Sequence, residues 1–217
     1  MEKKTRIPTQ KRALEKYNKI IDAAYKLFNE KGYYNTTTAD ISKEAGVATG
    51  SVYAYFNDKK EIYIKVIEKI NDNFNYPTRT FWQENTDKGF DNPETVKDLF
   101  KLFIKMVMDY HDFSKIFHDE MNALALLDED IAKVVNDQLD NRVIRTREVF
   151  EALSIPTKSK EDEEIFIYYV LLLIDDVCHK ILYGDDVINV DLYIDKCVSM
   201  IYTLFESSID YKRIEKP

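Results

Sequence analysis

A chain of 217 residues has room for one large or two small domains, and with five glycines and five prolines it favours long helices over a sheet rich in turns. Hydrophobic residues make up 45% of it, as in a globular protein with a buried core. The net charge of −8 argues against a nucleic-acid partner for the whole chain, but residues 1–70 hold 14 Lys or Arg against 9 Asp or Glu, and residues 71–217 hold 17 against 30. A basic end joined to an acidic body indicates that one part meets phosphate groups and the other does not.

The sequence lacks the features of secreted, membrane-bound and catalytic proteins. No N-terminal run is apolar enough for a signal peptide, and the longest apolar stretch, residues 165–174, is half of the roughly 20 residues that a bilayer span needs. No nucleophile and base recur at a recognisable spacing, and no glycine-rich loop could hold a phosphate group. We therefore expect a cytoplasmic protein that is not an enzyme, makes no membrane contact and needs no cofactor.

The first sixteen residues are basic and almost without apolar side chains. We expect a mobile arm there, either a solvated tail or an arm that enters a DNA minor groove. An amphipathic helix follows and ends at Gly32. Its apolar stripe consists of Ile20, Ile21, Ala24, Leu27 and Phe28.

Two short helices joined by a glycine turn are predicted between residues 36 and 60. Thr37 and Asp40 form a helix-start signature, so a helix of about two turns should begin near Thr38. Gly46 can adopt a positive φ angle and end that helix. The pattern then predicts a new helix from Thr49.

The second short helix should turn Val52 and Phe56 inward and leave a small polar outer surface. Two such helices at about a right angle form a helix-turn-helix, whose second helix can lie in the DNA major groove. Thr49 and Ser51 could hydrogen-bond to base edges, and Gly50 would allow close approach. Three longer side chains could reach phosphates: Tyr53, Tyr55 and Lys59. The alternative, a helical hairpin in an ordinary all-α core, is equally compatible with the spacing.

A longer pattern separates these alternatives. An amphipathic helix ends in Leu-Phe and is followed by Gly-Tyr, Thr-Thr, Ile, Ala-Gly-Val, Gly, a Tyr-x-Tyr-Phe string and Lys. The matching positions are Leu27, Phe28, Gly32, Tyr33, Thr36, Thr37, Ile41, Ala45, Gly46, Val47, Gly50, Tyr53, Tyr55, Phe56 and Lys59. With this pattern, residues 20–62 resemble the N-terminal DNA-binding domain of the TetR family of transcriptional regulators. The likeness covers about the first third of the chain.

The resemblance implies a set of DNA-contacting residues and a phosphate contact for Lys59, in the first turn of a helix capped by Asp58. The DNA-binding set is Thr36, Thr37, Thr49, Gly50, Ser51, Tyr53, Ala54, Tyr55 and Lys59. Ala48 stands where a serine hydroxyl could have capped the second short helix, so that cap should be absent or come from elsewhere. Ala54 offers only a methyl group, which suits contact with a thymine methyl.

Beyond Ile70 the helical pattern weakens. We expect a flexible connection over residues 71–92 that contains a short helix around residues 78–85. Asn92 and Pro93 then supply a helix cap and a first-position proline. Further helices are predicted after them, over residues 114–127 and over 129–153.

Ser159 should cap a helix over residues 160–183, in which residues 165–174 are apolar on every side. A buried strand competes for this run, but the acidic first turn and the lack of partner strands favour a helix. A second subunit would most simply cover one side of it. Together with a last helix over residues 190–210, it is predicted to form the four-helix interface of a homodimer, which the resemblance also implies. The interface residues are Tyr168, Leu172, Val198, Ile201 and Phe205.

The body of the chain is rich in aromatic residues and methionine. Most should be core, yet such side chains also suit a pocket for an apolar or aromatic ligand. The resemblance implies a small-molecule effector that shifts the dimer to a form with poor fit to DNA. The predicted ligand-binding residues are Trp82, Phe103, Met106, Tyr110, Phe117, Met121, Tyr169 and Asp176.

Five positions in the last two predicted helices leave alternatives open. Asp175 and His179 lie four apart on one helix face beside Asp176, and could form a helix-internal ion pair or recognise a cationic effector. They could also bind a metal ion with help from His118, Asp119 or Glu120. The two thiols, Cys178 and Cys197, are expected to be buried, with a redox switch as the alternative.

The sequence as a whole predicts an all-α protein of about nine helices. Residues 1–70 should form a helix-turn-helix domain with a basic arm, and residues 71–217 a helical domain for ligand binding and dimerisation. We expect a ligand-responsive repressor that binds double-stranded DNA at a near-palindromic operator. The alternatives are a non-catalytic helical scaffold and a redox- or metal-responsive regulator.

Overall fold

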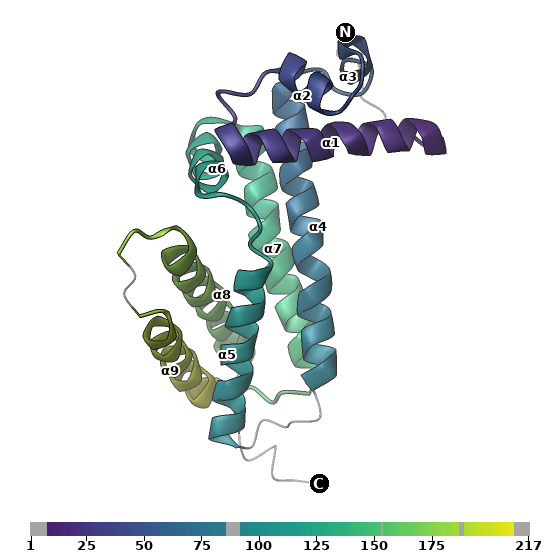
Figure 1. Ribbon diagram of the computed structural model, residues 1–217. Coiled ribbons are helices and arrows are strands. Elements are labelled where there is room, and N and C mark those ends of the chain that lie inside the picture. The colour runs from purple at the N-terminus through teal and green to yellow at the C-terminus, as the bar shows by residue number, and fades with distance from the viewer. Residues whose placement is uncertain (1–7, 86–91, 153, 187–188, 211–217) are drawn as a thin grey trace. The chain divides into compact units, whose positions relative to one another are not determined.

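The computed structural model describes residues 8–85, 92–152, 154–186 and 189–210, and Figure 1 shows them as a set of helices. Within these residues no β-strand is formed, which confirms the all-α prediction. The helices are α1 (Lys11–Lys31), α2 (Thr38–Glu44), α3 (Thr49–Val52), α4 (Lys59–Asn85), α5 (Pro93–Asp109), α6 (Lys115–Leu127), α7 (Glu129–Ala152), α8 (Lys160–Tyr183) and α9 (Val190–Ser208).

Side-chain caps account for many of the helix starts. The hydroxyl of Thr37 accepts from the Asp40 backbone N–H to begin α2, and Asn92 and Ser114 accept in the same way at α5 and α6. The predicted cap at Ser159 is also present, 3.0 Å from the Asp162 nitrogen. These caps satisfy backbone N–H groups that lack a partner in the first helical turn, so local sequence placed the helix starts well.

The basic arm is shorter than the sequence predicts. Helix α1 begins at Lys11, so Lys11, Arg12 and Lys16 are helical, while residues 1–7 lie outside the described residues. The extra helical turns carry Tyr17, whose buried ring stacks on Phe56 at a centroid distance of 5.0 Å. Because this ring is buried, the helix extends toward the N-terminus beyond the apolar stripe that begins at Ile20.

The expected flexible connection after residue 70 is wrong over residues 71–77, and the short helix predicted around residues 78–85 is the last part of a longer one. Helix α4 continues without a break from Lys59 to Asn85. Near its C-terminal end Phe81 and Trp82 each lie 5.3 Å from the ring centroid of Phe103 in α5. Tertiary packing of this kind stabilises a helix where the periodic pattern is weak.

The chain forms two compact units. The first comprises the described residues up to Asp72 together with Asp112–Asp137, and the second comprises Asn73–His111 and the described residues from Gln138 onward. The first unit therefore adds α6 and the beginning of α7 to the residues for which a DNA-binding domain is predicted. A functional division near residue 70 stays a prediction.

The first unit is built on an aromatic cluster beneath α1 and α4. Tyr63 of α4 is fully buried, and its ring lies within 5.3 Å of the ring centroids of Phe28, Tyr33 and Phe117. These four rings come from α1, from the loop after it, from α4 and from α6. The cluster therefore holds α1, the loop after it, α4 and α6 together next to the two short helices.

The second unit has an apolar core between α5, α8 and α9. Phe166 of α8 lies 6.5 Å from Phe100 and 5.8 Å from Phe205, measured between ring centroids. Aromatic pairs at these distances stabilise a core beyond their burial alone. Among the described helices none is long and apolar enough to span a bilayer.

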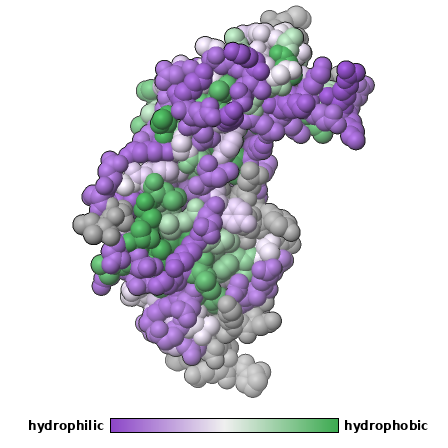
Figure 2. All heavy atoms as spheres, viewed as in Figure 1, coloured by the Kyte–Doolittle hydropathy of each residue, from purple (hydrophilic) through white to green (hydrophobic). Residues whose placement is uncertain are grey.

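The apolar residues of α8 divide between two sides. Phe166, Ile167, Val170, Leu171 and Ile174 are buried in the unit's own core. Tyr168, Tyr169 and Leu172 between them are about half exposed, and Figure 2 shows hydrophobic residues gathered over α8 and α9. The exposed apolar residues of the two helices include Ile165, Tyr168, Tyr169, Leu172, Leu192, Tyr193 and Met200.

This division corrects part of the predicted dimer interface. Val198, Ile201 and Phe205 are at most 5% exposed and belong to the core of their own unit. The stripe of α9 that was assigned to a partner subunit packs on α5 and α8 instead. Tyr168 and Leu172, at 53% and 51% exposed, remain accessible to a partner.

Candidate nucleic-acid interface

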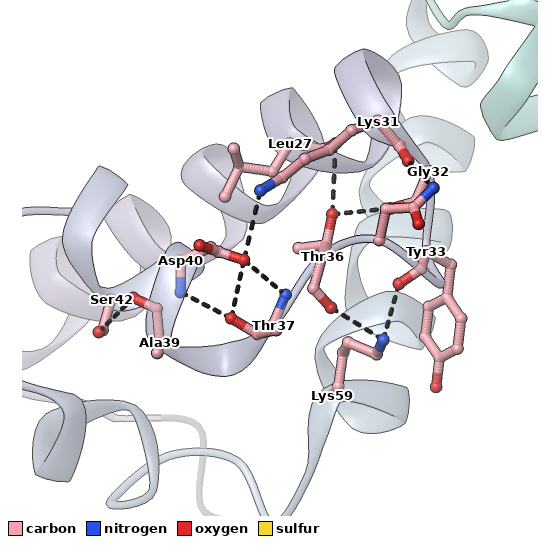
Figure 3. A network of polar contacts seen from close by, with 11 residues as sticks. Leu27, Lys31, Gly32, Tyr33, Thr36, Thr37, Ala39, Asp40, Ser42 and Lys59 are labelled. Atoms are coloured by element: carbon pink, nitrogen blue, oxygen red, sulfur yellow. Dashed lines mark hydrogen bonds and ion pairs between the residues drawn. The ribbon is translucent and has the colours of Figure 1, made fainter.

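The start of α2 is held by a capping box in which two residues satisfy each other's backbone (Figure 3). The Thr37 hydroxyl accepts from the Asp40 N–H at 3.1 Å, and the Asp40 carboxylate accepts from the Thr37 N–H at 3.0 Å. Hydrogen bonds from Thr37, with a further one from Lys31, lower the pKa of Asp40 to about 2. The first short helix therefore begins at a fixed point relative to α1.

A left-handed glycine and a buried serine join α2 to α3. Gly46 has φ +65°, and the next residue, Val47, donates its N–H to the carbonyl of Ser42 at 3.0 Å. The Ser42 hydroxyl donates to the Ala39 carbonyl at 2.9 Å and lies 3.0 Å from the hydroxyl oxygen of Thr49. Because Ser42 gives its one proton to Ala39, Thr49 donates to Ser42, and the two lone pairs of the Thr49 oxygen can still accept hydrogen bonds.

Helix α3 is only four residues long and has no side-chain cap. Ala48 has the extended backbone of a cap position, but it lacks the oxygen that would accept from an N–H. The predicted absence of a side-chain cap is therefore confirmed. Inward-facing Val52 and Phe56, at most 1% exposed, anchor the segment in the core.

The structure brings most of the predicted DNA-binding residues to one exposed segment. Thr49, Gly50, Tyr53 and Ala54 are exposed, as is Thr37 at the start of α2. Two further residues of the predicted set, Ser51 and Tyr55, are partly buried. The Tyr55 ring packs edge-on against Tyr17 of α1, with 6.0 Å between centroids.

Thr36 does not belong to this exposed segment. Its side chain is fully buried, and its hydroxyl donates to the Gly32 carbonyl at 2.7 Å (Figure 3). A hydroxyl committed to a carbonyl inside the protein cannot reach a base or a phosphate. The structure therefore corrects its assignment to the DNA-binding set and makes it a support for the loop before α2.

Lys59 is also engaged inside the protein (Figure 3). Its Nζ donates to the Tyr33 carbonyl at 2.7 Å and to the Thr36 carbonyl at 2.8 Å, and lies 4.1 Å from the centroid of the Tyr33 ring. Burial lowers the pKa of this lysine, while the nearby charge of Glu120 opposes that shift. Two N–H groups of the ammonium thus donate to backbone carbonyls and its charge lies near an aromatic ring, which disfavours the predicted phosphate contact.

Glu120 is a functional candidate that the pattern of the first 60 residues did not predict. Its carboxylate accepts from the backbone N–H of Tyr33, and it lies so close to Gly32 that a Cβ atom there would come within 2.6 Å. Tyr33 and Glu120 are 87 positions apart in the chain. No local motif could have paired them.

The predicted ligand-binding residues do not form one site. Trp82, Phe103 and Met106 belong to the core of the second unit or pack against it, but Phe117 and Met121 lie in the first unit. Two others of the set, Tyr110 and Tyr169, are 45% and 46% exposed. The last, Asp176, lines a surface groove of about 380 Å³ between α8 and α9, together with Leu173, Val177, Leu192, Tyr193, Lys196, Cys197 and Met200.

The polar cluster of α8 is organised by an arginine. Arg142 of α7 donates to both carboxylate oxygens of Asp175, at 2.6 and 2.9 Å. The His179 ring lies 5.3 Å from that of His111, centroid to centroid. Within the described part of the chain, no three His, Cys, Asp or Glu side chains converge as metal ligands. Asp175 does form an ion pair, but its partner is Arg142 of α7 and not a residue of its own helix as predicted.

Comparisons with known proteins agree on one family. Residues 20–66 match the pattern described as bacterial regulatory proteins, tetR family. The chain is 30% identical over 162 residues to the biofilm operon icaADBC HTH-type negative transcriptional regulator IcaR of Staphylococcus epidermidis. The aligned residues cover 73% of this chain and 80% of that protein. Over 54 residues, 25% of this chain and 28% of the relative, it is 43% identical to the fatty acid metabolism regulator protein of Bacillus subtilis.

Solved structures share the fold. A TetR-family protein from Mesorhizobium loti superposes with a TM-score of 0.71 at 15% identity, over 93% of this chain and all of that one. The fatty acid degradation regulator FadR from Bacillus halodurans superposes with a TM-score of 0.56 at 24% identity, over 88% of this chain and 94% of that one. At these identities the likeness concerns the fold alone.

Proposed function

The chain belongs to the TetR family of bacterial regulatory proteins, and we propose that it is a transcriptional repressor released from a near-palindromic operator by a small apolar or aromatic effector. The observation that carries the DNA-binding part is the exposed segment of Thr49, Gly50, Tyr53 and Ala54 on a capped helix-turn-helix. These exposed residues contribute little to packing, so the alternative of a helical scaffold without DNA binding does not account for them. The names of the relatives, which are transcriptional regulators, support the same assignment.

Base reading in this proposal depends chiefly on Thr49. Its hydroxyl donates to Ser42, so toward DNA it would accept a hydrogen bond, as from the amino group of an adenine or a cytosine. Gly50 allows the backbone to approach the bases, and Ala54 would contact a thymine methyl. Tyr53, which is 50% exposed, is proposed to reach a phosphate.

A homodimer is the proposed binding form. The exposed apolar residues of α8 and α9, among them Tyr168 and Leu172, form a surface that a second copy would cover. A two-fold dimer would place two copies of α3 about 34 Å apart, one turn of DNA. This arrangement is the reason for proposing a near-palindromic site.

The proposed effector binds in the second unit, near Trp82, Phe103 and Met106, where aromatic and thioether groups would contact an apolar molecule. Trp82 is the chain's one tryptophan, so quenching of its fluorescence at the concentrations that release DNA would tie effector binding to function. Burial raises the pKa of Cys178 to about 12 and that of Cys197 to about 11. Both thiols therefore stay protonated at neutral pH, which disfavours the redox-responsive alternative.

The test is a gel-shift titration with DNA from upstream of the chain's own gene and with a scrambled duplex of equal length. We expect the upstream DNA to bind about 1000-fold more tightly or better, with affinity that falls steeply as salt rises. Thr49→Val removes the accepting oxygen and should reduce this preference about tenfold. Thr49→Ser keeps the hydroxyl and is the matched control.

Equal affinity for the two duplexes would remove the assignment as a sequence-specific regulator. If Thr49→Val discriminates as well as Thr49→Ser does, base reading lies elsewhere on the segment. Both variants keep the inward-facing Val52 and Phe56, but Thr49→Val also loses the hydrogen bond to Ser42, so the thermal unfolding of the two variants is compared to check that the helix-turn-helix is intact.

A further inference from the structure

We propose that Lys59 and Glu120 are positioning residues, which set the geometry of the helix-turn-helix by binding the backbone carbonyl and the backbone N–H of Tyr33, and that Lys59 does not contact a DNA phosphate. The inference deepens the proposed function and rests on it for its effect on DNA. Its structural part concerns the loop between α1 and α2 and can be measured without DNA.

The loop is bound from two directions at one residue. The Tyr33 carbonyl accepts from Nζ of Lys59, at the first residue of α4, and the Tyr33 N–H donates to the carboxylate of Glu120 in α6. Lys59 also binds the Thr36 carbonyl at 2.8 Å. The next residue, Thr37, is the cap of α2, so the two contacts of Lys59 end one residue before the helix-turn-helix begins.

The inner side of the loop is also held by buried contacts. Thr36 is buried, with its hydroxyl bonded to the Gly32 carbonyl, and Gly32 has φ +83°. The Tyr33 ring packs 4.8 Å from the Tyr63 ring, measured between centroids. The path of the chain from α1 to α2 is therefore determined by a small set of directional contacts, and a change in them would alter where α2 and α3 lie.

Glu120 reaches the loop because α6 is itself fixed on α1. The Ser114 backbone N–H donates to Oδ1 of Asn29 at 2.6 Å, and the Ser114 hydroxyl donates to the Asn29 carbonyl at 2.8 Å. The hydroxyl of Tyr25 donates to the carbonyl of Asp112, just before α6, at 3.1 Å. The N-terminal end of α6 thus lies in register with the last turns of α1, which brings Glu120 to Tyr33.

The charge of each residue makes the proposal distinguishable from direct DNA binding. Removing a phosphate-contacting lysine flattens the plot of log affinity against log salt by roughly 0.9. Removing Glu120 takes away a negative charge, which by simple electrostatics would tighten binding to DNA. A positioning role predicts weaker binding for both variants, and a salt slope that the Lys59 variant leaves unchanged relative to its control.

The experiment compares Lys59→Met, Glu120→Ala and the control Lys60→Met in the full chain. Lys60 lies next in α4 and is paired with Asp128 and Asp130, so Lys60→Met removes the same charge without touching the Tyr33 loop. We expect Lys59→Met and Glu120→Ala each to weaken operator binding about tenfold. In the free protein, both should speed hydrogen exchange at the amides of Tyr33 and Thr36, whereas Lys60→Met should not.

Several outcomes would overturn the proposal. A salt slope flattened by roughly 0.9 in Lys59→Met relative to Lys60→Met, with exchange at residues 33–37 unchanged, would restore the phosphate contact. Tighter DNA binding by Glu120→Ala would show that its charge matters and its position does not. If Lys59→Met fails to fold, Glu120→Ala decides, since its predicted sign is opposite to the electrostatic one. If the wild type fails to discriminate between duplexes, the proposed function fails, and the exchange data still decide whether the two residues hold the loop.

Discussion

The interior of each of the two units is stabilised by a different kind of contact. Among the described residues the buried polar side chains are Thr36, Ser42 and Ser208, and the first two lie in and around the helix-turn-helix of the first unit. The second unit has a continuous apolar core and leaves a further apolar surface on α8 and α9 exposed. Hydrogen bonds are directional and apolar burial is not. Polar contacts therefore add a defined orientation to a segment that the buried Val52 and Phe56 anchor, whereas a surface for the proposed second subunit needs only shape and apolar area.

The largest expected effect comes from placing a charge on the exposed apolar surface of the second unit. Leu172→Asp should convert the proposed dimer to a monomer, because a carboxylate would have to be buried without a partner. Loss of the second half-site contact should weaken operator binding by about 100-fold. Sedimentation equilibrium measures the first effect and a DNA titration the second.

The matched control is Leu139→Asp, which changes a leucine of α7 that is 42% exposed. It should leave the molecular mass in solution and the DNA affinity as in the wild type. A Leu172→Asp protein that sediments as a dimer would move the interface away from this face of α8.

The next effect tests the directional contacts of the first unit. Gly32 has φ +83° and ψ 171°, a backbone region that essentially only glycine adopts. Gly32→Ala should lower the free energy of unfolding by about 1–3 kcal/mol, measured by urea denaturation. The new Cβ atom would also displace the Glu120 carboxylate from Tyr33.

A double variant separates backbone strain from the displaced contact. Glu120→Ala removes the carboxylate, so the double variant Gly32→Ala with Glu120→Ala should be barely less stable than Gly32→Ala alone. Additive losses would mean that Glu120 still reaches Tyr33 in the single variant.

The smallest effect concerns the exposed capping box. The folded-state pKa of Asp40 is about 2 against an ordinary value of 3.8, so its ionised form stabilises the fold above pH 3.8. That contribution is lost as the pH falls from 3.8 toward about 2. Asp40→Asn should therefore be less stable than the wild type at neutral pH, and the difference should shrink at pH 3. A difference that is the same at both pH values would assign the stabilisation to the shape of the side chain and not to its charge.

Local sequence was sufficient for the helices and for much of the candidate site. The caps at Thr37, Asn92 and Ser159 and the left-handed Gly46 are properties of four or five consecutive residues, and each was predicted. The weak pattern after residue 70 misled the prediction because the packing of Phe81 and Trp82 on α5 supports the helix there.

The differences between the predicted and the observed site share one cause. Thr36 belongs to a familiar Thr-Thr pair and Lys59 stands at a position typical of a phosphate ligand, yet both use their polar groups on backbone carbonyls. The salt-slope measurement decides whether Lys59 contacts a phosphate. Val198 and Phe205 lie on a regular apolar stripe, but periodicity does not say whether such a stripe faces the same chain or another. In each case the sequence shows the type of residue but not which group that residue contacts.

The amino-acid sequence was enough to establish the all-α class, the helix-turn-helix and the family, because caps, glycine turns and apolar periodicity are encoded within a few neighbouring residues. Only the tertiary structure decided which polar groups are used inside the fold and which apolar residues stay on the surface. Those outcomes depend on contacts such as that between Tyr33 and Glu120, 87 positions apart, and on which side of α8 the core covers. A side chain that is fully engaged with groups of its own chain cannot contact another molecule, and those contacts are known only from the folded structure.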